Sequence, residues 1–291
     1  MAIPAADVKK LRDQTGAGMM DCKAALEEAN GNFEEAGTIL RKKGLASAAK
    51  KAGRATSQGL IGSLVSDDHR TGILVEVNCE SDFVARTDDF KALIDDVLRE
   101  IDEAGDAATD AWLKDPGGPV QQRVAATIGK LGENMAAPRF VRFAGQGYVA
   151  QYIHPPGLIG VQVEFGGVTP EVAARAEMTM LAKEIAMQIA AASPVAPQYV
   201  SRAAVPPAVL DKEREIYRAQ MEASGKPANV IEKIVEGKLA SFYEQVVLPD
   251  QLSIRPEPKQ TVGKLIEAAA KSLGAPVSVL RFARLKVGET A

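Results

Sequence analysis

The order hairpin, then long helix, occurs twice in this chain, and this repeat limits the possible folds more than any other feature. In the first copy, at 59–103, apolar residues gather in two short segments, 59–66 and 71–78, around a polar turn. Such a pair of segments is typical of an antiparallel hairpin. The second copy spans 147–192. The repeat predicts a core of two related α/β units, each with a small antiparallel sheet.

The helix of the first copy carries one apolar stripe with a spacing of three and four residues, formed by Phe90, Leu93, Ile94, Val97, Leu98 and Ile101. Such a stripe packs against a sheet, and the opposite face of this helix is strongly acidic. In the second copy, Pro170 opens the helix. Apolar alternation at 139–165 predicts the second sheet. A final helix at 261–273 precedes a strand at 277–287, which we expect to return to that second sheet.

The first 44 residues contain three short helical patterns with clear boundaries. Asn32 and Glu35 resemble a capping box at the start of the third pattern. The Lys-Lys-Gly sequence that ends at Gly44 is typical of a helix C-terminus. We therefore predict a small module of three short helices over 1–44. Residues 45–57 are alanine-rich and basic, which predicts an exposed helical or extended connector.

Two further helical patterns occupy 208–247 and flank the turn-forming sequence Ser-Gly-Lys-Pro at 224–227. Together they predict a protruding antiparallel helical hairpin. We therefore divide the chain into three parts. These are the module with its connector (1–55), a first core subdomain (56–140), and a second core subdomain that contains the hairpin (141–291).

The composition is that of an ordinary folded protein, with 46% hydrophobic and 25% charged residues among 291. The longest nearly uncharged helical stretch, 185–196, is well short of the roughly 20 apolar residues that a membrane span needs. The N-terminus lacks the apolar region of a secretory signal, so we expect a cytoplasmic protein. Cys22 and Cys79 are too few for a disulfide framework or a four-cysteine metal site, and we expect both to be reduced packing residues.

Little in the sequence suggests catalysis or cofactor binding. His69 and His154 are the only histidines, and histidine is the commonest side chain in general-base and metal chemistry. No G-x-x-x-x-G-K-[ST] motif occurs, and the glycines at 16–18 join two predicted helices instead of following a strand. We expect no catalytic residue, no metal site and no cofactor, and no nucleotide bound by the chain itself.

Charge is unevenly distributed along the chain. The basic stretch 41–54 suits nucleic acid in charge, but it lacks the interleaved aromatic residues that nucleic-acid surfaces use. Between residues 67 and 110 there are fourteen acidic residues and four Lys or Arg. This excess repels phosphate backbones and suits a basic protein surface. The alternative for the acidic stretch is a solvated helix face.

Phe83 stands among polar residues in the segment 77–86, where a predicted strand meets a predicted helix, and it lies outside the apolar stripe. The residues alone leave two interpretations. Phe83 packs beneath its own turn, as an isolated aromatic near a helix start commonly does. Alternatively, it is presented to a partner.

Two long motifs stand out: L-R-x-x-T-G-A-G-M-M-D-C-K-x-A-L at 11–26 and E-V-N-C-E-S-D-F-V-A at 76–85. Shorter ones follow in order: K-L-G-E-N at 130–134, I-G-V at 159–161, S-G-K-P at 224–227, V-E-G-K at 235–238 and T-V-G at 261–263. With these motifs the chain resembles the elongation factor Ts family over nearly its whole length. Three departures are Ser81, where the family commonly has Thr, the Pro-Pro pair after His154, and the lack of a further helical module after Val287.

The resemblance implies an α+β fold: a UBA-like three-helix module, a core of two related α/β subdomains, and a coiled-coil hairpin. It implies a guanine-nucleotide exchange factor, without covalent catalysis, for the GTPase elongation factor Tu. The residues expected near the magnesium and phosphate site of that partner are Ser81, Asp82, Phe83 and Val84. Further partner-binding candidates are Arg12, Met19, Met20, Gly132, Asn134 and His154. For Arg12, Met19 and Met20 the alternative is packing in the core of the module.

Two other classes of function stay open at this point. A UBA-like module alone suggests a ubiquitin-type adaptor, and the basic connector suggests an RNA-binding accessory protein. We expect no direct nucleic-acid contact and no membrane contact. Whether two copies form a homodimer within a larger complex is left open by the sequence.

Overall fold

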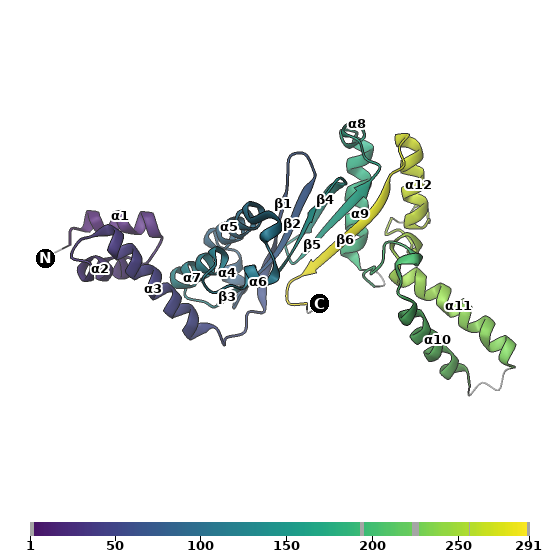
Figure 1. The fold of residues 1–291 in the computed structure, drawn as a ribbon, viewed down its shortest axis with the longest axis horizontal. Coiled ribbons are helices and arrows are strands. Elements are labelled where there is room, and N and C mark those ends of the chain that lie inside the picture. Colours follow the sequence, from purple (N-terminus) through teal and green to yellow (C-terminus); the bar gives the residue numbers. More distant parts are fainter. Residues whose placement is uncertain (1–2, 193–194, 223–226, 256, 290–291) are drawn as a thin grey trace.

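The computed structural model describes residues 3–192, 195–222, 227–255 and 257–289. The chain forms an elongated molecule with a small helical module at one end, stacked sheets and helices in the middle, and a helical hairpin at the other end (Figure 1). This mixture of helices and small antiparallel sheets confirms the predicted α+β class.

The N-terminal module consists of α1 (Ala5–Thr15), α2 (Met19–Glu28) and the first half of α3 (Phe33–Lys51). Its small core is formed by Val8, Leu11, Cys22, Ala25, Leu26, Ala29 and Ala36. Asn32 caps α3, because its Oδ1 accepts from the backbone N–H groups of Glu34 and Glu35 at 3.0 and 3.2 Å. The three predicted helices and this cap are confirmed.

The predicted end of the third helix at Gly44 is wrong, because α3 runs on without a break to Lys51. Gly44 is buried, and it lies where α3 crosses α7 (Pro119–Leu131). A Cβ added to Gly44 would lie 3.3 Å from the carbonyl oxygen of Ala125 in α7. The glycine therefore permits close contact between two helices instead of ending one, and most of the expected connector belongs to α3.

The first sheet is antiparallel in the order β1 (Gln58–Val65), β2 (Thr71–Cys79) and β3 (Met135–Ala144). Its outer face packs against α5 (Asp88–Ala104) and α7. The predicted stripe of α5 is buried along its whole length. The short elements nearby are α4 (Asp82–Ala85), a 3₁₀ turn η1 (Gly105–Ala107) and α6 (Asp110–Leu113).

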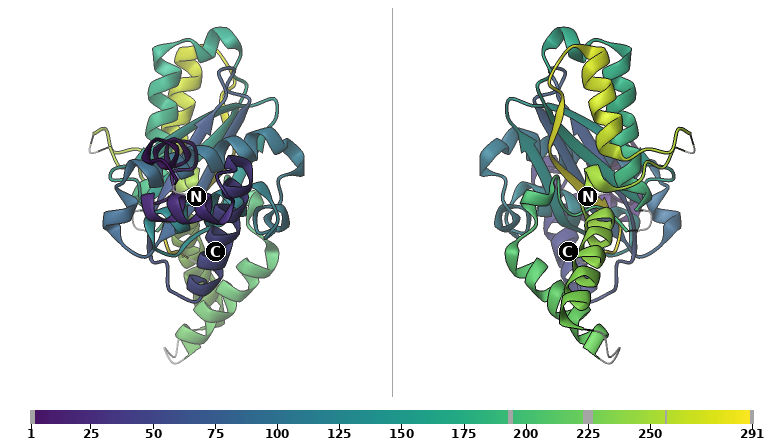
Figure 2. Two further views of the ribbon diagram at one scale, coloured as in Figure 1. Left: turned by 90° about the vertical axis from the view of Figure 1, so that its left-hand side faces the viewer. Right: turned by 90° about the vertical axis from the view of Figure 1, so that its right-hand side faces the viewer.

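The second sheet has the order β4 (Tyr148–His154), β5 (Ile159–Gly166) and β6 (Ser278–Lys286), again antiparallel. The predicted return of the last strand to this sheet is confirmed. Its outer face is covered by α9 (Ala176–Ala191), preceded by α8 (Pro170–Ala173), and by α12 (Val262–Leu273). Both views of Figure 2 show α9 and α12 side by side on this face.

The expectation that a second sheet starts at 139 is wrong, because β3 pairs with β2. Phe140, for example, is the register partner of Val75. Alternation predicted a strand here correctly, but alternation does not say which sheet accepts it. Residues 135–144 thus belong with the first sheet, and the division of the chain into subdomains stays a prediction.

The two sheets stack face to face. Ile61 and Leu74 of the first sheet and Leu285 of the second are buried together. Almost all of β2 is therefore buried, on the face toward the helices and on the face toward the second sheet. The result is a core with the layer order helix–sheet–sheet–helix. Strand β2 is packed on both faces, so its last residue, Cys79, is held in place.

The hairpin is formed by α10 (Pro207–Glu222) and α11 (Ala228–Val246), and it projects away from the core (Figure 1). Arg218 pairs with Glu232 across the two helices at 2.8 Å. At the base, between η2 (Arg202–Ala204) and η3 (Leu248–Asp250), the Arg202 guanidinium donates to both carboxylate oxygens of Asp250. The turn predicted at 224–227 lies outside the described residues except for Pro227.

No helix in the described part of the chain is long and apolar enough to span a membrane.

Candidate functional site

Phe83 lies on α4, a single helical turn that follows β2 directly. Ser81 begins this turn as its N-cap, and its Oγ accepts from the Val84 backbone N–H at 3.3 Å. Serine therefore supplies the capping oxygen of this turn. Ala85 is buried and Val84 packs against the core, so the turn has one anchored face.

Glu133 holds the start of this turn with both carboxylate oxygens. The Ser81 hydroxyl donates to Glu133 Oε1 at 2.6 Å, and the Ser81 backbone N–H donates to Oε2 at 3.0 Å. Hydrogen bonds to an ionised carboxylate are among the stronger ones in proteins. Two such bonds to one residue fix both the position and the orientation of Ser81.

The end of the turn is fixed as well. Asp82 accepts from the Arg86 guanidinium at 2.6 Å, and Thr87 Oγ1 donates to the Val84 carbonyl at 2.8 Å while capping α5 at Phe90. Asp82 is thus paired four residues onward along the chain, and the N-cap of α4 is Ser81. The turn is tied to β2, α5 and Glu133.

The side chain of Phe83 is 79% exposed. The interpretation that Phe83 packs in the core is therefore wrong. Single exposed apolar residues are common on protein surfaces. Phe83 differs in that the short turn that carries it is held by hydrogen bonds at both ends. The backbone around Phe83 is therefore held in one position while its ring is left in solvent.

Gly132 and Asn134 lie directly behind this turn. Gly132 ends α7 with a φ of 80°, which reverses the chain and brings Glu133 to Ser81. Asn134 is only 7% exposed. Its backbone N–H donates to Glu80 at 2.6 Å, and its side-chain amide donates to the Arg54 carbonyl at 2.8 Å. Both residues support the segment that carries Phe83.

Met19 and Met20 begin α2 and are 44% and 76% exposed. Arg12 is exposed on α1. The alternative that these three side chains pack in the core of the module is therefore wrong. Methionine on a surface suits an adaptable apolar contact.

Lys130 connects this end of the module with the start of α5, the helix that follows the Phe83 turn. A Cβ added to Gly16 would lie 3.2 Å from Lys130 Nζ, so the lysine lies against the turn that precedes Met19. The same Nζ pairs with Asp89, in the first turn of α5, at 2.6 Å. The start of α2 and the start of α5 are thus linked through one side chain.

His154 ends β4 and is exposed, with its Nδ1 2.9 Å from the Tyr152 hydroxyl. The turn after it returns at Gly157, whose carbonyl accepts from the Ile61 backbone N–H at 2.8 Å. The first residues of β1 pair with the last residues of β2, next to α4. His154 is therefore connected to the Phe83 turn only indirectly, through β1. The contacts of the described residues include none between His154 and that turn.

The sequence did not single out Glu133 or Lys130, although both stand in the K-L-G-E-N motif. A charged residue directly after a glycine that ends a helix is a signal that could have identified Glu133. Lys130 carries no such signal, since its contacts with Gly16 and Asp89 depend on how the module and the core meet.

One buried thiol lies at the base of this turn. Burial, together with the nearby Glu133 carboxylate, raises the pKa of the Cys79 thiol to about 11. The thiol is therefore neutral near pH 7, and it donates to the Ser81 carbonyl at 3.1 Å. Cys22 and Cys79 are free and buried, as expected for reduced packing residues.

The chain is similar to known proteins over almost its whole length. The pattern of the family "Elongation factor TS" matches residues 80–289. Elongation factor Ts of Aquifex aeolicus is 41% identical over 298 residues, which cover 99% of each chain. The relative from Lawsonia intracellularis is 42% identical over 99% of this chain and all of its own length. Elongation factor Ts of Symbiobacterium thermophilum is 44% identical over 99% of this chain and 92% of its own.

These matches place the protein among the translation elongation factors. The chain belongs to the elongation factor Ts family.

Proposed function

We propose that this protein binds elongation factor Tu in its GDP form, disrupts the magnesium and phosphate site of that partner, and promotes exchange of GDP for GTP. The observation that carries the proposal is Phe83, 79% exposed on a turn held at both ends. Asp82 and Phe83 enter the partner, Ser81 and Val84 hold the turn in place, and Arg12, Met19, Met20 and His154 supply further contacts.

The energies suit this role. Burying one phenylalanine in a partner yields roughly 1.5 to 3 kcal/mol, which corresponds to about a tenfold to hundredfold change in an equilibrium constant. Because the turn is preorganised, little of that free energy is lost to ordering it upon binding. The remaining weakening of GDP binding comes from the other contacts.

Linkage makes the complex transient. If the factor weakens GDP binding to its partner, GDP weakens binding of the factor by the same free energy. The protein thus acts by binding, with no covalent step, and we place it in the cytoplasm, where its partner works. A homodimer within the larger complex is compatible with this scheme.

The direct test is nucleotide release. We expect the purified protein to bind no nucleotide and to hydrolyse none, yet to accelerate loss of labelled GDP from elongation factor Tu in proportion to its concentration. Filter binding or fluorescence of a GDP analogue measures both properties. Tight GDP binding by the isolated chain, or an unchanged release rate, would overturn the proposal.

Capture of partners from a cell lysate separates the other classes of function. A dominant GTPase that added GDP releases supports exchange. Retention of ubiquitin chains identifies an adaptor, and retention of RNA that high salt abolishes identifies an RNA-binding protein. Either of the last two results, without the GTPase, contradicts the exchange function.

Shortening the hairpin should affect basal exchange less than any change at the Phe83 turn. The arm projects away from the core, and its base is held separately by Arg202 and Asp250. Removing whole helical turns symmetrically about Gly225 keeps the pairing of α10 with α11 near the base. Exchange and thermal melting should both stay close to those of the full chain. Loss of exchange with unchanged melting would show that the arm contributes directly.

A further inference from the structure

The N-terminal module is joined to the core by a continuous helix. The first half of α3 packs inside the module, and in its second half Ala48 packs against the first hydrophobic core. A helix without a break transmits the position of one end to the other. The module therefore does not hang from a flexible segment.

A close crossing of two helices fixes the second half of α3. A Cβ added to Gly129 of α7 would lie 3.4 Å from the Cα of Gly44, and one added to Gly44 would lie 3.3 Å from the Ala125 carbonyl. Both distances are at the tight limit for a methyl group, so a larger side chain at either glycine forces the helices apart.

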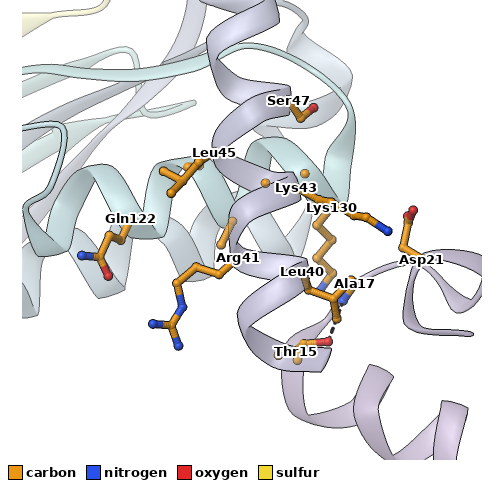
Figure 3. Close-up of a pocket in the computed structure, with 15 residues that line it drawn as sticks. Thr15, Ala17, Asp21, Leu40, Arg41, Lys43, Leu45, Ser47, Gln122 and Lys130 are labelled. Carbon is orange, nitrogen blue, oxygen red and sulfur yellow. Dashed lines mark hydrogen bonds between the residues drawn. The ribbon is translucent and has the colours of Figure 1, made fainter. Parts of the chain in front are cut away.

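Lys130 supplies a second, separate contact between the two parts. Its Nζ lies beside Gly16 of the module and pairs with Asp89 of the core at 2.6 Å. Figure 3 shows Lys130 extending from α7 toward Ala17 and Thr15, along a groove of about 370 Å³ between the module and the core. The crossing fixes the second half of α3, and the lysine contacts the turn before α2. Two separate points of contact restrict rotation as well as translation.

We infer that Gly44, Gly129 and Lys130 are positioning residues that hold the module and the Phe83 turn in one fixed geometry, so that Met20 and Phe83 meet the partner together. The joint contact of Met20 and Phe83 with the partner rests on the proposed function. The fixed geometry of the module and the Phe83 turn does not. A surface organised before binding gains affinity because the module need not be ordered in the complex.

The geometry can be measured without any partner. Both native cysteines are buried, so spin labels attach selectively to the exposed changes Gln14→Cys on α1 and Ala92→Cys on α5. Pulsed electron spin resonance then gives the distribution of distances between the module and the core. We expect one narrow distribution in the otherwise unchanged protein. A broad distribution would overturn the inference by itself.

Gly44→Leu should broaden or shift this distribution, and the matched control is Gly37→Leu. Gly37 lies in the same helix, and a Cβ added there meets nothing within 4 Å. The control should keep the narrow distribution. Lys130→Ala, which adds no bulk, should broaden the distribution less than Gly44→Leu, and it serves as the test if Gly44→Leu fails to fold. Unchanged distances in both Gly44→Leu and Lys130→Ala would contradict the inference.

Measuring GDP release distinguishes a residue that positions the module from a residue that contacts the partner directly. Gly44→Leu should raise the concentration of factor needed for half-maximal GDP release by about tenfold, while the maximal rate stays within about twofold, because the Phe83 turn is intact. An unchanged half-maximal concentration in a folded variant with altered distances would overturn the shared-surface role. If the unchanged protein released no GDP at all, the proposed function would fail, and the distance measurement would still decide the geometry.

Discussion

Phe83→Ala is expected to slow GDP release from elongation factor Tu by about tenfold to hundredfold while the folded protein melts within about 2 °C of the unchanged one. The ring is 79% exposed, so its removal opens no cavity in the chain itself. Exposed substitutions of this kind change the free energy of unfolding by about 0.5 kcal/mol or less. The loss should therefore appear in the complex. Stopped-flow release of a fluorescent GDP analogue and calorimetric melting measure the two quantities.

The matched control is Phe90→Ala, seven residues further along. Phe90 is fully buried in the first hydrophobic core, so its truncation should lower the free energy of unfolding by about 3 to 5 kcal/mol. The two phenylalanines should thus show opposite patterns: activity lost with stability kept, and stability lost with activity kept in the fraction that stays folded. A Phe83→Ala protein that melts much earlier and exchanges GDP normally would remove Phe83 from the site.

Asp82→Ala tests whether the two neighbours act as a unit. Because Ser81 caps the turn and Asp82 pairs with Arg86, the turn should persist in this variant, with exchange reduced in the same direction. If Asp82 and Phe83 enter the partner together, the double variant should lose less than the sum of the two single losses in free energy. Strict additivity would show that each residue acts independently.

The sequence was sufficient for elements whose signals are local. The apolar stripe of α5, the Asn32 cap and the hairpin of β1 and β2 depend on residues within a few positions of each other. Gly44 shows the limit of that reasoning. A glycine after two lysines commonly ends a helix. Gly44 instead permits close contact with α7, whose Gly129 lies some 85 positions later in the chain and faces Gly44. Likewise, alternation in β3 predicted a strand, but its partner β2 depends on the whole sheet.

The site divides in the same way. The polar neighbours of Phe83 at a strand-to-helix junction are a local feature of the sequence. From this feature alone, an exposed Phe83 ring was one of two possible interpretations. The hold on Ser81 is not local, because Glu133 comes 52 residues later in the chain. The support from Asn134, which reaches Arg54 across 80 residues, is equally hidden from any local pattern. The sequence thus indicated which side chain to examine, and the structure adds what keeps it in place.

Removing the module should weaken association with elongation factor Tu by at least about tenfold, because Met19, Met20 and Arg12 are lost together. The structure also decides where to cut. Deletion of residues 1–40 keeps the second half of α3, including Gly44 and Ala48, on α7. The remaining core should melt close to the full chain, since each part has its own hydrophobic cluster.

Deletion of residues 1–55 is the informative comparison, since it also removes the second half of α3 and, with it, Arg54. Its carbonyl accepts from the buried Asn134 amide, and its guanidinium pairs with Glu80 at 3.4 Å. The longer deletion thus removes the packing of α3 on α7 and leaves the Asn134 amide without its partner, so it should melt earlier as well as bind weakly. Titration of GDP release and calorimetry on both truncated proteins measure the difference. Undiminished affinity after deletion of residues 1–40 would show that the module takes no part in binding. Equal melting of the two truncated proteins would show that neither the second half of α3 nor the Arg54 contacts stabilise the core.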